Sequence, residues 1–182
     1  MDNGGAQEIQ WIWACKQPLQ AIRANPALGA IEIAKGALGD GLPHKTLRVS
    51  RHHRMLVTSK IARRIYGAPE VLAAAKDLTA IGGIRPAPLH GAITYYHILM
   101  PRHEILFADG AMSESLYLGR ETLHAIKPAA QNELRRIFGP MRDVIMITPP
   151  TPSRPMVQGK KLRQLIVRHL KNNKPLSNIA LH

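Results

Sequence analysis

The stretch "GAITYYHILMPRHEILFADGAMSESLYL", residues 91–118, carries three β-strand patterns in succession. It predicts one strand from Ile93 to Met100, a second from Glu104 to Ala108 and, after an Asp109-Gly110 turn, a third short strand. Pro101 has no backbone N–H group to donate to a strand ladder, so a bulge or a bend is expected there. This region is the most β-rich part of the chain, and it favours a mainly β fold.

A second β pattern, "LRVSRHHRMLV", places two adjacent histidines between apolar residues that stand at alternate positions. The pattern predicts extended backbone at both of its ends. Successive side chains of an extended segment point to opposite faces, so only one of His52 and His53 would face the core or a site.

The remaining β patterns are short and are separated by helical turns. Asn3-Gly4 predicts a turn into a strand in which Ile9, Trp11 and Trp13 share one face. A short helix is expected between Pro18 and Pro26, followed by the strand "AIEI" and a glycine-rich turn region. Two further short helices are expected before residue 91. One is capped by Ser59 and ends at Gly67, and the other starts at Pro69 and carries Val71, Leu72, Ala75 and Leu78.

The composition changes after residue 118. Pro128 is expected to start a helix, and a proline-rich connector follows at 148–155. The last pattern is a basic amphipathic helix with an apolar stripe of Leu162, Leu165, Ile166 and Leu170. The sequence therefore predicts a β domain over residues 1–118 and a helical C-terminal extension over residues 119–182.

The net charge of +13 and the pI near 10.5 raise the alternative of a basic binding module for nucleic acid or an anionic surface. Its strongest sequence support is the segment from Lys160 to Lys174. The other cations are spread along the chain, and no RNA-binding aromatic motif, helix-turn-helix or zinc finger accompanies them. The sequence contains no apolar stretch long enough to span a bilayer, and its first residues lack a signal-peptide pattern.

His52, His53, His97 and His103 all fall in the β patterns, and histidine is the side chain best suited to transfer protons at neutral pH. Each histidine considered alone has a structural alternative, as a hydrogen-bonded residue in a strand. No carboxylate or cysteine recurs among them at ligand spacing, so neither a metal nor a cofactor is predicted.

Two nucleophile candidates also have structural alternatives. Ser50 lies near His53, but no GxSxG pattern surrounds it, and the end of a strand explains it more simply. Cys15 is the only cysteine of the chain, which excludes an internal disulfide. Its apolar surroundings favour a buried, unreactive thiol over a nucleophile.

Taken together, "GALGDGLPHKTLRVSRHHRMLV", "VLAAAKDL" and "ITYYHILMPRHEILFADGAMSESLY" resemble the bacterial Hedgehog/intein (Hint) domain family. The likeness is to the branch often attached to secreted calcium-binding repeat proteins, and it covers nearly the whole chain. Two features carry it: "GLP" followed by "LxVSxxHRMLV", and "YxH" followed by "RHEILFAxGxxSES". The resemblance implies an all-β, horseshoe-like fold with short inserted helices and C-terminal helices.

The resemblance also implies self-processing of the backbone. In the family, a cysteine or serine attacks the preceding carbonyl and converts an amide to a thioester or an ester, which leads to autocleavage or splicing. The histidine that protonates the leaving nitrogen falls on His53, with His52 at a variable site. His97 stands where inteins usually have an aspartate, His103 where they have a histidine, and Asp109-Gly110 matches the family turn.

The sequence departs from the family at its front. The nucleophile pattern C-F-x-x-G-T-x-I, which precedes "DNG" in the family, is absent from these 182 residues, and Cys15 lacks its G-T-x-I continuation. Arg51 also stands where many relatives have proline. The resemblance therefore predicts an N-terminally truncated member that is inactive alone in self-cleavage. Its partner would be its own flanking polypeptide or a missing N-terminal segment.

Overall fold

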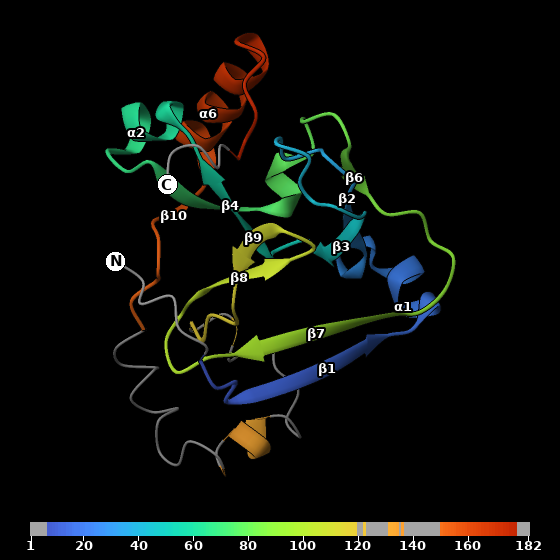
Figure 1. Ribbon diagram of the computed structural model, residues 1–182. Helices are drawn as coiled ribbons and strands as arrows, with labels where there is room; N and C mark the ends of the chain where they lie inside the picture. Colours follow the sequence, from blue (N-terminus) through green and yellow to red (C-terminus); the bar gives the residue numbers. More distant parts are fainter. Residues whose placement is uncertain (1–6, 120–121, 123–130, 135, 137–149, 178–182) are drawn as a thin grey trace. The chain divides into compact units, whose positions relative to one another are not determined.

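The computed structural model describes residues 7–119, 122, 131–134, 136 and 150–177 (Figure 1). In this part of the chain β-strands predominate and the helices are few and mostly short, which confirms the predicted mainly β fold. The chain forms two compact units. The small unit contains the described residues of segments 1–14, 96–104 and 115–153, and the large unit contains those of segments 15–95, 105–114 and 154–182. Among the described helices, none is long and apolar enough to cross a membrane.

The large unit is built on a five-stranded sheet in the order β10-β5-β4-β9-β8. Its strands are β4 (Arg54–Thr58), β5 (Glu70–Ala74), β8 (Ile105–Ala108), β9 (Ala111–Glu114) and β10 (Met156–Val157). Neighbouring strands are antiparallel, except that β10 runs parallel to β5. Asp109 and Gly110 join β8 to β9 with positive φ angles of 48° and 80°, the geometry of a two-residue hairpin. The predicted turn is confirmed.

A second sheet of the large unit has the order β3-β2-β6, formed by β2 (Ala30–Ile33), β3 (Leu47–Ser50) and β6 (Ile84–Pro86). Both outer strands pair antiparallel with β2. Glu32 in the middle strand is buried and accepts hydrogen bonds from Arg48 at 2.9 Å and Arg85 at 3.1 Å. These two guanidinium groups, Arg48 first, hold the pKa of the Glu32 carboxyl below its usual value.

The stretch from Leu47 to Val57 is not one strand, although its alternating pattern runs without interruption. It divides into β3 and β4, which belong to different sheets, and Arg51 and His52 form a turn between them. The His53 N–H group donates to the Ser50 carbonyl at 3.1 Å and closes this turn. The two histidines therefore do not lie in one strand, and the alternation of strand faces does not decide which of them points inward.

The helix predicted from Pro69 is wrong, because its apolar residues form strand β5 and a short 3₁₀ helix, η2 (Ala75–Leu78). β5 lies between β4 and β10, and Val71, Leu72 and Ala73 are fully buried. A strand covered on both faces has a continuous apolar run, which periodicity cannot distinguish from a buried helix.

The other helical predictions in the large unit are confirmed. Helix α1 (Leu19–Ala24) follows Pro18, and a 3₁₀ turn, η1 (Pro26–Leu28), comes next. Helix α2 (Lys60–Tyr66) begins at the Ser59 cap, whose Oγ accepts the Ala62 N–H at 3.0 Å, and ends at Gly67 with φ 76°.

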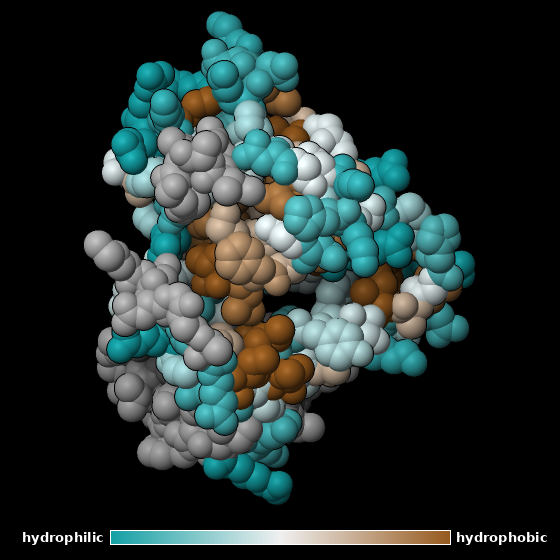
Figure 2. Space-filling model, viewed as in Figure 1, coloured by the Kyte–Doolittle hydropathy of each residue, from teal (hydrophilic) through white to brown (hydrophobic). Residues whose placement is uncertain are grey.

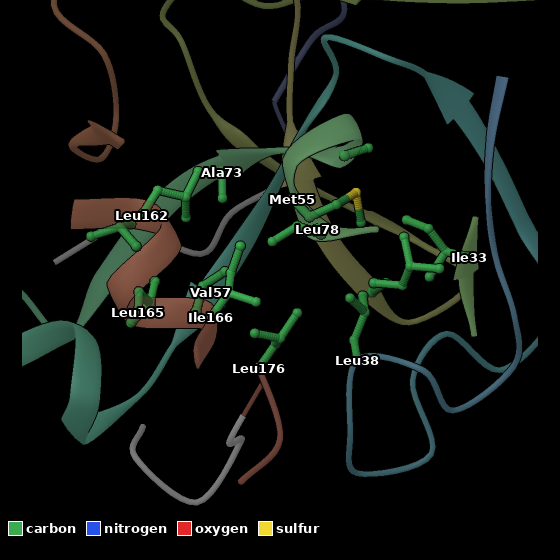
Figure 3. Packing of buried hydrophobic residues seen from close by; sticks show 14 of the residues in the cluster. Ile33, Leu38, Met55, Val57, Ala73, Leu78, Leu162, Leu165, Ile166 and Leu176 are labelled. Atoms are coloured by element: carbon green, nitrogen blue, oxygen red, sulfur yellow. The ribbon is translucent and has the colours of Figure 1, made fainter. Parts of the chain in front are cut away.

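The C-terminal helix α6 (Gly159–Lys171) packs into the core of the large unit, beside Val57 of β4 and Ala73 of β5 (Figure 3). Leu162, Leu165 and Ile166 are buried as predicted, and each such side chain stabilises the fold by roughly 1.5–3 kcal/mol. The prediction for Leu170 is wrong, since it is 49% exposed. The fourth buried position of this helix is taken by His169.

Strands β1 (Trp11–Gln17) and β7 (Ile93–Leu99) form a two-stranded sheet whose residues are divided between the two units. In the small unit, a cluster of apolar residues contains Trp11, Leu99, Leu118 and Leu134, with Trp13 and Leu116 packed against it. The predicted turn at Asn3-Gly4 and the start of the helix predicted from Pro128 lie outside the described residues. The boundary between a β domain at 1–118 and an extension at 119–182 stays a prediction.

Candidate functional site

His53 lies in the link between β3 and β4, where backbone hydrogen bonds fix it from two directions. Its N–H donates to the Ser50 carbonyl, and its own carbonyl accepts the Ala75 N–H at 2.9 Å. Two residues earlier, the Arg51 carbonyl accepts the Lys76 N–H at 3.1 Å. The imidazole is half-buried. The link is thus bound to the start of η2, and the main chain that carries His53 is fixed at both sides of the residue.

The residue after His53 is held by a buried carboxylate. Glu114 of β9 is 7% exposed and accepts the Arg54 N–H at 2.9 Å, while the Arg54 guanidinium donates to the same carboxylate. The Arg54 N–H thus donates to a carboxylate instead of a backbone carbonyl. Such a charge-assisted hydrogen bond is shorter and stronger than a neutral one. Glu114 therefore sets where β4 begins and, with it, the position of His53.

His52 differs from its neighbour, because its side chain is exposed. Partial loss of hydration lowers the pKa of His52, and the positive charges of Lys76, Arg54 and Arg51 lower it further. His52 is therefore mainly neutral at neutral pH. The two histidines share a sequence environment but not a structural one.

His97 of β7 lies in a stack of aromatic rings in the small unit. Its ring centroid is 4.9 Å from that of Trp13 with an interplanar angle of 22°, and Trp13 stacks in turn on Trp11 at 6.0 Å. Burial lowers the pKa of His97, so its ring is neutral at neutral pH and has a lone pair to accept a proton.

His103 follows β7 after the bend at Pro101, as the proline predicted, and is 6% exposed. Its Nδ1 accepts the Ser153 N–H at 3.1 Å, and its ring meets Tyr117 edge-on with the centroids 5.1 Å apart. An Nδ1 that accepts a hydrogen bond requires the hydrogen of the neutral ring to be on Nε2. Tyr117 donates to the Pro150 carbonyl at 2.8 Å, so part of the proline-rich connector covers this histidine.

Neither nucleophile candidate has the geometry of an activated group. Cys15 lies inside β1, is half-buried, and its Sγ accepts a hydrogen bond from Gln17 at 3.2 Å. Ser50 ends β3 in register with Ala30. Among the described residues, no group of three or more His, Cys, Asp or Glu side chains could hold a metal ion.

The family model of the Hint domain matches residues 1–120 of this chain. The chain belongs to the Hint domain family. No curated protein matches it, and no solved structure does. The match contains both β sheets of the large unit except β10, together with β1, β7 and all three histidines to which the resemblance gives a role.

The structure distributes those three histidines over the two units of the Hint domain. His97 and His103 belong to the small unit, and His53 belongs to the large unit. Their supporting residues were not predicted from the sequence. The strand pattern places Trp13 on one face with Trp11 but does not indicate its contact with His97. Glu114 lies in the "SES" motif, to which the resemblance gives no role. Ser153 gives no local signal, since it lies fifty residues from His103 in sequence.

Proposed function

We propose that this Hint domain carries out the acyl-shift chemistry of self-processing, with His53 as the proton donor to the amide nitrogen that leaves. The Hint domain family is generally self-processing, and the observation that carries the assignment to His53 is its rigid backbone support. A general acid must stay within hydrogen-bond distance of one atom throughout the reaction. The bonds to Ser50 and Ala75, and the Glu114 carboxylate next to them, supply this constraint.

We assign His97 and His103 to later proton transfers. A lowered pKa keeps the ring of His97 neutral and able to accept a proton. The bond from Ser153 to Nδ1 leaves the hydrogen of His103 on Nε2, so a neutral His103 acts as a hydrogen-bond donor there. One ring suited to accept and one suited to donate support a division of roles between the two.

The attacking sulfur or oxygen is proposed to come from a segment other than these 182 residues. The only cysteine, Cys15, follows a peptide bond that lies within strand β1, and an amide held in a strand ladder is poorly placed for attack on its carbonyl. The 182-residue polypeptide alone should therefore keep its mass of 20.1 kDa during long incubation with thiols. A cleavage product that disappears in Cys15→Ala would overturn this part of the proposal.

The test of His53 uses this chain joined at its N-terminus to a segment with the family's nucleophile pattern, a cysteine followed by G-T-x-I. Thiol-dependent cleavage would be followed by mass spectrometry at neutral pH. His53→Ala should slow it by about 10²–10⁴-fold, the usual contribution of a general acid. His52→Ala is the matched control, because it removes an adjacent exposed imidazole and should leave the rate within about twofold. Equal rates for His53→Ala and the unmodified protein would refute the role of His53.

A further inference from the structure

Two basic helices of the large unit, α2 and α6, lie side by side at the edge of the fold (Figure 1). Three exposed cations come from α2 and six from α6 and the turn that follows it. They are Lys60, Arg63 and Arg64, and Lys160, Lys161, Arg163, Arg168, Lys171 and Lys174. We call these nine residues the α2–α6 cationic surface.

Acidic residues are missing from both helices, as the sequence of residues 60–66 and 159–174 contains no Asp or Glu. The first carboxylate after α2 belongs to Glu70, and the described structure pairs it with Arg154. None of the described ion pairs includes a member of the cationic surface. The surface over α2 and α6 is mostly hydrophilic in Figure 2. Within the described part of the chain, no carboxylate neutralises this positive charge.

We infer that the α2–α6 cationic surface binds the phosphate backbone of double-stranded nucleic acid. Four of its nine cations are arginines, whose planar guanidinium groups match phosphate oxygens in two-point contacts. Such contacts neutralise phosphates and release counterions without reading the base sequence. This inference is independent of the self-processing chemistry.

The chemistry of the two helices argues against two other anionic partners. A helix that binds lipid needs an apolar face to enter the bilayer, but Leu162, Leu165 and Ile166 of α6 are already buried in the core. Only Val167 and Leu170 are large apolar side chains exposed on α6, and these two neighbours are far fewer than the apolar face of a lipid-binding helix requires. Single strands are held mainly by stacking on aromatic rings, and the only aromatic residue of either helix outside the buried His169 is the half-buried Tyr66.

The number of phosphates contacted sets the expected salt dependence. If six of the nine cations contact phosphates, the logarithm of the association constant falls with the logarithm of salt concentration with a slope of about −5. Affinity would then drop by about 10³-fold between 50 and 200 mM salt.

The experiment measures binding of the full chain to a labelled random-sequence 20-bp DNA duplex, and to an RNA duplex of the same length, by fluorescence anisotropy at several salt concentrations. One variant, K160Q/K161Q/R163Q, neutralises part of α6, and a second, R63Q/R64Q, neutralises part of α2. The matched control is R23Q/K35Q/K45Q, which removes three exposed cations of the same unit outside both helices. Circular dichroism checks that each variant stays folded, as exposed positions should allow.

We expect the unmodified chain to bind duplexes at 50 mM salt. The affinity should fall at least tenfold in the α6 variant and measurably in the α2 variant. In both variants the association constant should depend less steeply on salt concentration. The control should keep its affinity within about twofold. Binding of either duplex with this pattern supports the inference, and a preference for one of them identifies the source of the phosphates. No binding at 50 mM salt overturns it, and so does an equal loss in the control, because binding would then follow net charge alone. Binding to phosphatidylserine vesicles without binding to either duplex also overturns it.

Discussion

His169 joins α6 to the cap of α2 through a buried imidazole, and this makes the stability of the large unit depend on pH. The Lys174 carbonyl 3.1 Å from Nδ1 can only accept, so the ring hydrogen lies on Nδ1 and the Ser59 hydroxyl donates to Nε2 at 3.0 Å. His169 is 1% exposed. Burial lowers its pKa below the ordinary 6.5, although the backbone oxygens beside the ring oppose the shift.

The sign of the pH effect follows from this shift. Well above pH 6.5 the ring is neutral in the folded and the unfolded chain, and it contributes no pH dependence. As the pH falls below 6.5, the unfolded chain binds the proton first, so the free energy of unfolding decreases by at most about 1.4 kcal/mol per pH unit. This decrease stops once the pH is below the folded pKa, where both states are protonated.

The test compares urea unfolding of the unmodified protein and His169→Gln, followed by circular dichroism between about pH 5 and pH 8. Other buried histidines contribute equally to both proteins and cancel in the difference. A second variant, His169→Phe, measures what the two hydrogen bonds contribute. It should lower the free energy of unfolding at pH 8 by about 2–6 kcal/mol, because the Ser59 hydroxyl and the Lys174 carbonyl lose their partner. The exposed His90 serves as the control through His90→Gln. A difference between the unmodified protein and His169→Gln that stays flat below pH 6.5 would refute the reasoning.

Three further predictions concern the other packed groups. Trp13→Ala should admit water to the ring of His97 and raise the pKa of His97 towards its ordinary value. An NMR titration measures this pKa, and an unchanged pKa would show that the stacked ring of Trp13 does not exclude water. Glu114→Gln should lower the free energy of unfolding by about 1.5–3 kcal/mol, because the guanidinium and N–H groups beside His53 lose an ionised acceptor, and urea unfolding at pH 7 tests it. Leu165→Ala should lower the free energy of unfolding by about 2–5 kcal/mol, because it leaves a cavity in the core. In the same assay Leu170→Ala should lower it by less than about 0.5 kcal/mol, because Leu170 is half-exposed.

The parts of the fold that the sequence predicted correctly are those with a local chemical signal. Asp109 and Gly110 both adopt the positive φ angles that the hairpin needs. Ser59 caps the start of α2 with its hydroxyl, and Gly67, which has no side chain, ends the helix with a positive φ. Pro101 ends a strand because it cannot donate to a ladder. None of these signals needs knowledge of a distant residue.

The wrong predictions depend on partners that are far away in sequence. The apolar run of β5 predicts a helix, because the strands and core residues that make it a buried strand come from elsewhere in the chain. The pattern of α6 does not indicate that His169 is buried, because the partner of its ring is Ser59, more than one hundred residues earlier. The supporting residues of the site also come from distant parts of the sequence. The family motifs indicate His53 and His103, but they do not indicate that Glu114 accepts the Arg54 N–H or that Ser153 donates to His103.

Strand β4 connects the two proposed activities of the large unit. His53 precedes its first residue and Ser59, the cap of the cationic helix α2, follows its last. A strand of five residues spans about 17 Å, so this rigid element separates the imidazole from the start of α2 by roughly that length. Because β4 pairs with β5 along its whole length and α6 packs behind both, the separation is fixed by the core. The cationic side chains of α2 and α6 take no part in the hydrogen bonds that hold the main chain at His53. Substitutions in the cationic surface should therefore alter binding without altering the acyl shift.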